Sequence, residues 1–359
     1  MKLNLAKISK NSKIAFESKI DSIKKKRVLE NFSKLLIRNK NKILEENKKD
    51  IKFARKKKIK DNLIKRLEMN EGKFNSIIKS IKEIIKIKDP TNKILERWKR
   101  PNGLIIQKVT VPIGVIAVIY ESRPNVTSDV ASLCFKSGNA VILKGGSEAF
   151  NTNKIISDLF RMSLKKCGVD KNYVQFIESK DRKVVDKLLS GMKGYIDLII
   201  PRGGKSLVKK VDTLSKIPYI GHLEGLCHTF IDKNAKLDMA IKVLENAKLR
   251  NTSICGATET VLFHRAIAKK FINPVLKNLQ NKGCNIYGDK FVKKLFNGKS
   301  TLANSKSWSK EYLSKNISAK VVKNLDEAIR HINHFGTMHT DAIITADKNT
   351  ANYFLKNIK

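Results

Sequence analysis

The sequence predicts an α/β fold, in which a parallel, doubly wound sheet is followed by a smaller α/β domain. From residue 104 onward, short β-rich runs alternate with helical stretches, as in successive right-handed βαβ units. The chain has 359 residues, more than the roughly 250–300 at which a single core stops growing. A second alternating region begins after Gly225. We therefore expect two domains, residues 1–225 and residues 226–359.

Helices are expected first, because apolar residues recur at three- and four-residue steps between about residues 19 and 88. Strands follow at residues 104–111 and 113–120, which are rich in β-branched residues and are joined across Pro112 and Gly114. Further strands are expected at residues 140–143, 173–177, 195–200, 227–231, 259–263, 320–322 and 342–345, with helices at residues 126–136, 153–166, 182–189 and 205–214.

The composition is that of a folded protein with an unusually basic surface. Hydrophobic residues make up 41% and aromatic residues 7% of the chain, and 74 Lys and Arg against 33 Asp and Glu give a net charge of +41. The lysines are spread over nearly every predicted helix instead of forming one stripe with interleaved aromatic residues. We interpret the charge as a compositional bias and expect no nucleic-acid partner. A basic nucleic-acid-binding protein is the contrasting alternative.

The five cysteines indicate a reducing compartment, which we expect to be the cytoplasm. They are odd in number and form no Cys-x-x-Cys pair, so neither a disulfide framework nor a zinc knuckle is predicted. His222, Cys227 and His228 match no standard spacing of metal ligands, and no metal is expected. The apolar runs are far shorter than the roughly 20 residues that span a bilayer, and residues 1–16 lack the apolar core of a signal peptide.

Two glycine-containing turns follow predicted strands and are candidates for binding a dinucleotide. The first is the run Lys144-Gly145-Gly146-Ser147, and the second, residues 201–205, contains a Gly-Gly pair after Arg202. Backbone N–H groups at a glycine-rich helix start can hold a phosphate. Neither turn matches the Gly-x-Gly-x-x-Gly fingerprint or the P-loop, and each alone is more often a plain turn. Two such turns on one sheet edge favour a dinucleotide.

Cys255 is the candidate nucleophile. It lies in the run Asn-Thr-Ser-Ile-Cys-Gly-Ala-Thr at residues 251–258, just before a predicted strand, whereas Cys134 lies in an apolar run typical of a buried thiol. The small, polar neighbours of Cys255 leave room for a substrate carbonyl and offer backbone N–H groups to an oxyanion. On spacing alone, a structural thiol is the alternative.

Four segments together resemble the gamma-glutamyl phosphate reductases, a branch of the aldehyde dehydrogenase superfamily. They are residues 111–125, 137–147, 222–228 and 251–258, and the run Tyr-Glu-Ser-Arg-Pro-Asn at the end of the first is specific to this branch. The resemblance implies an aldehyde-dehydrogenase-like fold and the NADPH-dependent reduction of L-glutamate 5-phosphate to L-glutamate 5-semialdehyde, the second step of proline biosynthesis. Within catalysis, the alternative is a hydrolytic or CoA-acylating aldehyde dehydrogenase.

The resemblance also implies roles in the reaction. Cys255 attacks the acyl phosphate and forms a thioester, which hydride then reduces. The backbone N–H of Cys255 and the side-chain amide of Asn125 stabilise the oxyanion. His222 stands where hydrolytic relatives have a water-activating Glu, and Glu224 stands where this branch more commonly has Asp. Arg123 is a candidate for binding the substrate carboxylate.

For the cofactor, the resemblance implies that Lys144 contacts the adenosine ribose. Ser147 replaces a Glu that binds the ribose 2′-hydroxyl in NAD-preferring relatives, so that a 2′-phosphate is not repelled and NADPH is favoured. Gly203 and Gly204 contact the cofactor phosphate, with Arg202 as an added positive charge. Glu311 holds the nicotinamide ribose. The alternative interpretation is that Glu311 is an ordinary exposed carboxylate on a helix.

The sequence also departs from the family. Thr337 replaces a Ser of the signature at residues 335–342, and Lys306 and Ser307 stand near Trp308 where an acidic residue is usual. The family continues beyond this signature, with a strand used for oligomer pairing, so we expect a C-terminal segment to be missing after Lys359. We expect a homo-oligomer where that segment is present, and a functional association with glutamate 5-kinase.

Overall fold

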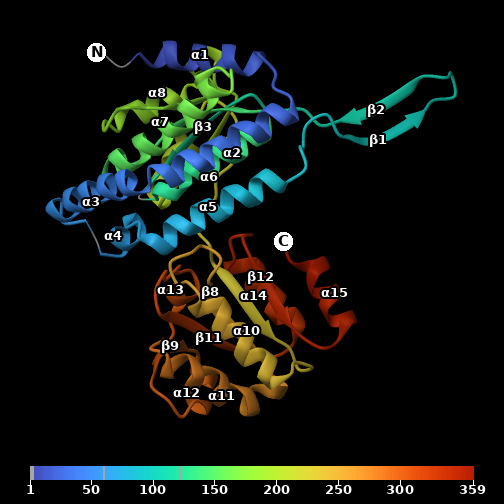
Figure 1. Cartoon of the computed structure of the whole chain (residues 1–359). Coiled ribbons are helices and arrows are strands. Elements are labelled where there is room, and N and C mark those ends of the chain that lie inside the picture. The colour runs from blue at the N-terminus through green and yellow to red at the C-terminus, as the bar shows by residue number, and fades with distance from the viewer. Residues whose placement is uncertain (1–3, 60, 122) are drawn as a thin grey trace. The chain divides into compact units, whose positions relative to one another are not determined.

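The computed structural model describes residues 4–59, 61–121 and 123–359. It divides into two compact units, Met1–Gly221 and His222–Lys359 (Figure 1). Each unit has its own parallel sheet with helices packed against it, which confirms the predicted α/β class. No helix in the described part of the chain combines the length and the apolar character that crossing a membrane requires.

The division falls after Gly221, whereas the sequence places it after Gly225. The reason lies in the hydrogen bonds of the connecting segment. The backbone N–H of Gly225 donates to Glu311 Oε1, and that of Leu226 donates to Thr337 Oγ1. Residues 222–226 are therefore bound to the second unit.

The first unit opens with helices whose starts are fixed by side-chain caps. Asn4, Asp21 and Asn70 each accept a hydrogen bond from the backbone N–H three residues further on, which satisfies one of the unpaired donors at a helix start. The helices α2 and α3 pack on α7, and α5 packs on α6. The five helices are α1 (Leu5–Glu17), α2 (Ser22–Arg38), α3 (Lys40–Lys56), α4 (Asp61–Leu67) and α5 (Glu71–Lys86).

The sheet of the first unit has the strand order β5-β4-β3-β6, and all of its pairs are parallel. The chain moves outward from β3 to β5 and then returns to the other side of β3, so the strand order reverses next to β3. In open parallel sheets, ligands bind at the carboxyl ends of the strands at such a point. The elements are β3 (Val115–Tyr120), α6 (Pro124–Lys136), β4 (Ala140–Lys144), α7 (Phe150–Lys166), β5 (Val174–Phe176), α8 (Lys183–Leu189), β6 (Leu198–Arg202) and α9 (Lys205–Leu214).

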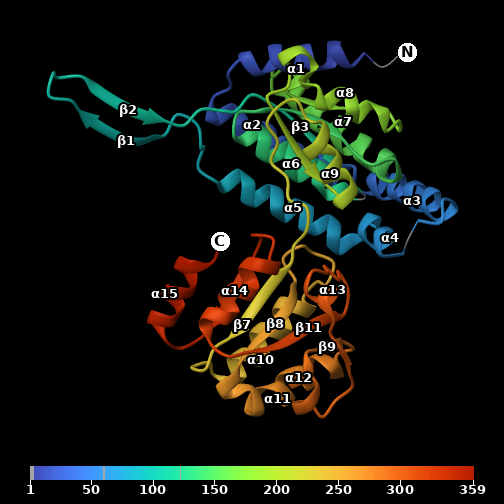
Figure 2. The ribbon, with the colours of Figure 1, turned by 180° about the vertical axis from the view of Figure 1, so that it is seen from behind.

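Two differences from the predicted strands have clear physical reasons. The strand β6 extends through Pro201 into Arg202, where the sequence predicts a turn. It lies at the edge of the sheet, where a proline without an N–H is tolerated. The predicted strand at residues 104–111 does not join the sheet. Instead, β2 (Ile105–Val109) pairs antiparallel with β1 (Ile94–Lys99), a strand that is not predicted from the sequence. Figures 1 and 2 show this hairpin projecting from the rest of its unit.

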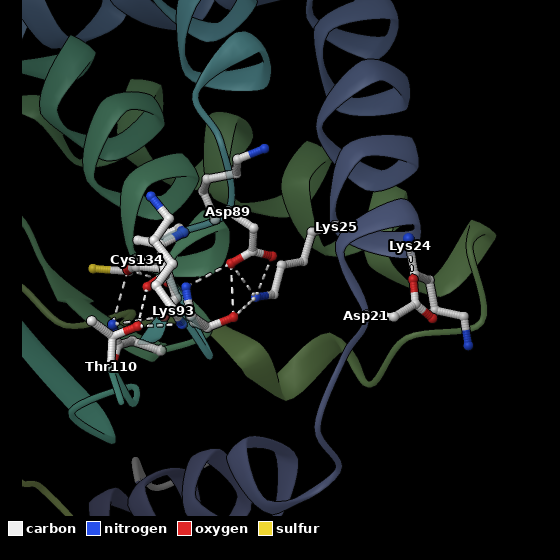
Figure 3. A network of polar contacts seen from close by, with 12 residues as sticks. Asp21, Lys24, Lys25, Asp89, Lys93, Thr110 and Cys134 are labelled. Atoms are coloured by element: carbon white, nitrogen blue, oxygen red, sulfur yellow. Dashed lines mark hydrogen bonds and ion pairs between the residues drawn. The ribbon is translucent and has the colours of Figure 1, made fainter. Parts of the chain in front are cut away.

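A polar network holds the base of the hairpin (Figure 3). Lys25 Nζ lies 3.0 Å from Asp89 Oδ2. The Thr110 hydroxyl donates to the Pro90 carbonyl at 2.6 Å and accepts from the Lys93 N–H at 2.9 Å. These bonds fix the chain where it enters and leaves the hairpin.

The second unit contains a six-stranded parallel sheet in the order β10-β9-β11-β8-β7-β12. The short strands β9 and β10 were not predicted, whereas β7, β8, β11 and β12 include the predicted segments almost completely. The strands are β7 (Cys227–Ile231), β8 (Thr258–His264), β9 (Asn285–Gly288), β10 (Ser300–Leu302), β11 (Asn316–Val322) and β12 (Asp341–Ile344). The helices are α10 (Leu237–Leu249), α11 (Ala268–Asn281), α12 (Lys290–Leu295), α13 (Ser305–Trp308), α14 (Leu325–Phe335) and α15 (Lys348–Asn357).

Candidate active site and cofactor cavity

A cavity of about 700 Å³ lies in the first unit at the carboxyl ends of β3 and β4. This volume is typical of a site for a small molecule or cofactor. The predicted turn lines it, since Lys144, Gly145, Gly146 and Ser147 all contribute. The other charged residues of the lining are mostly basic, which suits an anionic ligand. They are Lys57, Lys58, Lys180, Arg182 and Lys210, with Glu121 and Glu148 as the acidic members.

The turn after β4 brings backbone close to the cavity. A Cβ atom on Gly145 would lie 2.3 Å from Asn153 Nδ2, and Asn153 is fully buried and accepts a hydrogen bond from the Thr127 hydroxyl. This position therefore requires glycine. Lys144 is buried beside it and donates to the Gly145 carbonyl at 2.8 Å. Burial lowers the pKa of Lys144, and the carboxylate of Glu148 opposes that effect.

The second predicted turn has a different partner. The N–H of Gly204, which caps α9, donates to Glu121 Oε2 at 2.9 Å. A carboxylate thus lies at the helix N-terminus, a position that favours anions. Gly203 and Gly204 are outside the cavity lining, which takes Ser206 and Leu207 from the same helix.

Arg123 and Asn125 lie at the start of α6. Arg123 is the N-cap residue, and Asn125 is exposed, with its amide donating to Asp129 Oδ2 at 3.1 Å. Burial raises the pKa of Asp129, and the hydrogen bond from Asn125 opposes that rise. These residues belong to the first unit and Cys255 to the second, so their joint role in the reaction stays a prediction.

Cys255 lies at the centre of a turn between α10 and β8. The N–H of Ala257 donates to the Ile254 carbonyl at 3.1 Å and closes the turn. The thiol of Cys255 is exposed, whereas Cys227 and Cys284 of the same unit are buried. The structure therefore distinguishes one solvent-exposed cysteine from two that are part of the core.

Cys227 lies directly against this turn. Its Sγ atom is 3.1 Å from the Cys255 carbonyl oxygen, to which it donates. Burial raises the pKa of the Cys227 thiol to about 12, and the nearby Asp341 carboxylate contributes to the rise. In the sequence, Cys227 is a candidate only for a metal site with His222 and His228, and their spacing does not favour one. Among the described residues, no three His, Cys, Asp or Glu side chains are grouped so as to hold a metal ion.

The segment before β7 carries His222 and Glu224 and is bound through Thr337. His222 Nε2 donates to the Thr337 carbonyl at 3.0 Å. The Thr337 hydroxyl donates to the Glu224 carbonyl at 2.6 Å and accepts from the Leu226 N–H at 3.0 Å. Thr337 replaces the serine of the signature, and its hydroxyl makes both bonds. The ring of His339 packs edge-on against His222, with centroids 4.6 Å apart.

Glu311 lies beside the same segment, where its Oε1 atom accepts from the Gly225 N–H at 3.0 Å. The loop that carries it is anchored by a buried ion pair. Lys248 Nζ lies 2.6 Å from Glu259 Oε2, and Glu259 Oε1 accepts from the Leu313 N–H at 3.2 Å. The second unit therefore gathers Cys255, His222 and Glu311 around one segment.

Comparisons with known proteins identify the family to which the chain is similar. The model of the aldehyde dehydrogenase family matches residues 4–319. The gamma-glutamyl phosphate reductase of Bartonella tribocorum is 44% identical over 296 residues, which are 82% of this chain and 72% of the relative. That of Rhodospirillum rubrum is 44% identical over 298 residues, which are 83% of this chain and 69% of the relative.

Solved structures of related proteins are also similar to this chain. A crystal structure of gamma-glutamyl phosphate reductase from Thermotoga maritima has a TM-score of 0.92 and 35% identity, and the match covers 98% of this chain and 85% of that one. An acetylating aldehyde dehydrogenase from Geobacillus thermoglucosidasius is 15% identical with a TM-score of 0.68, over 97% of this chain and 82% of that one, and shares the fold.

Proposed function

The chain belongs to the aldehyde dehydrogenase family, in its gamma-glutamyl phosphate reductase branch, and we propose that it reduces L-glutamate 5-phosphate to L-glutamate 5-semialdehyde through a thioester on Cys255. It is an oxidoreductase acting at the aldehyde level, in proline biosynthesis. The observation that carries the proposed role of Cys255 is its exposed thiol at the centre of the turn before β8.

The mechanism follows from this thiol. The thiolate of Cys255 attacks the acyl carbonyl, a C–S bond forms, and the bond to phosphate breaks, so that one hard displacement becomes two easier steps. The backbone N–H of Cys255 and the amide of Asn125 stabilise the negative oxygen of each tetrahedral intermediate. One such donor is typically worth about 10² to 10³ in rate.

A reduced nicotinamide, if held in the cavity of the first unit beside Lys144 and Ser147, would supply the hydride that reduces the thioester on Cys255. When the tetrahedral adduct collapses, Cys255 leaves as the thiolate and is ready for the next cycle. No water is needed in either half-reaction. His222, whose Nε2 is engaged by a backbone carbonyl, lines the site without activating water. Arg123 binds the substrate carboxylate.

The aldehyde dehydrogenase family uses NAD(P), and we propose that this member prefers NADPH. The cavity of the first unit fits such a cofactor for two reasons. Gly145 has no side chain, so a ligand can approach its backbone, and basic side chains line the cavity. Lys144 and Ser147 would hold the adenosine ribose, without a carboxylate at position 147 to repel a 2′-phosphate. Lys180 and Arg182, which follow β5, supply positive charge to the same cavity.

The remaining cofactor contacts are proposed on the family match. Gly203 and Gly204 would contact a cofactor phosphate, with Arg202 nearby, and Glu311 would hold the nicotinamide ribose. The phosphate would then accept the hydrogen bond that the Gly204 N–H donates to Glu121 in this structure.

We further propose the cytoplasm as the compartment, because a nucleophilic thiol must stay reduced and the five cysteines are free. A homo-oligomer and a functional association with glutamate 5-kinase are proposed on the family match. An acyl phosphate is reactive toward water, which favours a consumer close to the enzyme that makes it.

The test is the reverse reaction, phosphate-dependent reduction of NADP by glutamate 5-semialdehyde, in the wild type and in Cys255→Ser. We expect the substitution to lower kcat by about 10³-fold or more, because it removes the nucleophile. Activity that survives it would refute the assignment of Cys255. Activity that requires CoA instead of phosphate would favour a CoA-acylating enzyme.

A further inference from the structure

The buried thiol of Cys227 has no part in the reaction as derived above. Cys227 begins β7 and pairs with Thr258, the first residue of the neighbouring strand β8. The turn that presents Cys255 ends just before Thr258. Two adjacent parallel strands therefore place the buried thiol next to the nucleophile's backbone.

Cys227 is a hydrogen-bond donor at neutral pH. The residue is only 2% exposed, and burial raises the pKa of its thiol, so the proton stays on sulfur. A backbone carbonyl can only accept, which makes the Cys255 oxygen at 3.1 Å the acceptor. His339 Nδ1 lies farther from the same sulfur, at 3.7 Å, and closer to the Thr340 hydroxyl, at 2.8 Å.

The same carbonyl is confined from a second side. A Cβ atom on Gly225 would lie 1.9 Å from the Cys255 oxygen and 2.7 Å from its carbonyl carbon. Only glycine leaves room for the carbonyl there. The oxygen thus lies between the Gly225 backbone and the Cys227 thiol.

Fixing this carbonyl fixes the nucleophile. A peptide group is planar, so the direction of the Cys255 carbonyl sets the plane that joins Cys255 to Gly256. That plane, together with the hydrogen bond from the Ala257 N–H to the Ile254 carbonyl at 3.1 Å, restricts the direction in which the Cα–Cβ bond of Cys255 points.

We propose that Cys227 is a positioning residue for the nucleophile, because its S–H bond to the Cys255 carbonyl aims the Cys255 thiolate at the acyl carbon. This inference rests on the proposed role of Cys255. Loss of one neutral hydrogen bond corresponds to roughly 2- to 10-fold in an equilibrium, and a nucleophile displaced by about 1 Å can lose about 10²-fold in rate. We expect kcat to respond within this range.

The experiment compares Cys227→Ala, which lacks a donor, with Cys227→Ser, which keeps one. Cys284→Ala is the matched control, because Cys284 is a buried thiol of the same unit, beside β9. We expect Cys227→Ala to lower kcat about 10-fold or more while the KM values for semialdehyde and NADP stay within about 2-fold of wild type. Cys227→Ser recovers most of the loss, and Cys284→Ala keeps wild-type kcat.

Alkylation by iodoacetamide provides a readout that does not depend on cofactor. The rate at which Cys255 is modified should fall in Cys227→Ala and recover in Cys227→Ser. Gly225→Ala retains both thiols but displaces the carbonyl, and we expect it to reproduce the loss of kcat. Each variant is compared at equal concentration of folded protein, measured by its unfolding curve, so that a loss of stability is not counted as a loss of rate.

Two results would overturn the inference. If Cys227→Ala keeps wild-type kcat while Cys255→Ser is inactive, the nucleophile stands and the positioning role is wrong. If Cys227→Ser loses as much kcat as Cys227→Ala, packing and not the hydrogen bond is responsible. Survival of activity in Cys255→Ser instead refutes the proposed function itself, which separates the two failures.

Discussion

Loss of the positive charge from the buried pair of Lys248 and Glu259 should destabilise the second unit strongly. The side chains of this pair are 0% and 2% exposed, and their charged atoms are 2.6 Å apart. In Lys248→Met, the Glu259 carboxylate stays buried without its partner. Breaking a buried pair in this way costs about 3–5 kcal/mol, a large part of the roughly 5–15 kcal/mol that holds a typical domain folded.

The double variant Lys248→Met/Glu259→Leu separates pairing from packing. It removes both charges, so its free energy of unfolding should lie within about 1–2 kcal/mol of wild type. The remaining cost is the Leu313 N–H, which loses its acceptor on Glu259. Glu311 lies two residues before Leu313, so we also expect the KM for NADPH to rise in the single variant.

Urea denaturation followed by circular dichroism measures both variants. The unfolding of each unit is fitted separately if the transitions separate. If Lys248→Met loses less than about 1 kcal/mol, or the double variant is less stable than the single one, the pair is not the anchor that its burial implies.

Three further predictions concern the cavity and the core. Arg182→Ala should raise the KM for NADPH about 10-fold with little change for NADH, since the cavity loses positive charge that favours the 2′-phosphate; equal effects on both cofactors would contradict this. Gly145→Ala should weaken cofactor binding at least about 10-fold in a titration, because its Cβ would lie 2.3 Å from Asn153 Nδ2, whereas Gly72→Ala, with 3.6 Å of clearance, should bind normally. Burial lowers the pKa of His331 from 6.5 to about 3, so the stability it contributes is complete above about pH 6.5 and is lost as the pH falls toward 3. The slope is at most about 1.4 kcal/mol per pH unit, and pH-dependent melting should show a shallower loss in His331→Phe.

The periodicity of the sequence predicts the sheets well because buried parallel strands are continuous apolar runs. The strand β3 is buried at every position, and its bounds are predicted almost correctly. The strand β1 is exposed at every position and carries Glu96, Arg97 and Lys99, so it has no apolar pattern to detect. The strands β9 and β10 have the sequences Asn-Ile-Tyr-Gly and Ser-Thr-Leu, so neither forms an apolar run that would indicate a buried strand.

Some of the site residues can likewise be predicted from the sequence, and others cannot. Cys255 is visible in the sequence because small polar neighbours distinguish it from buried thiols such as Cys134. The proposed role of Cys227 depends on β7 and β8 being neighbours in the sheet. Local sequence patterns predict where strands occur but not their order in a sheet. Lys180 and Arg182 were missed for another reason: in a chain with 74 Lys and Arg, one more basic residue is no signal. Their position after β5 was the available indication.

The carboxylate of Glu121 at the start of α9 would compete with the cofactor phosphate for the same backbone N–H group. Under the proposed placement of the cofactor phosphate, two anions contend for the Gly204 N–H, and they repel each other. Cofactor binding is then an exchange of one anion for another, and its net free energy is a difference between two similar interactions. The Gly204 N–H has a hydrogen-bond acceptor both with and without bound cofactor. An enzyme that must release an oxidised cofactor after every turnover gains from such an exchange, because the departing phosphate leaves behind no unpaired donor.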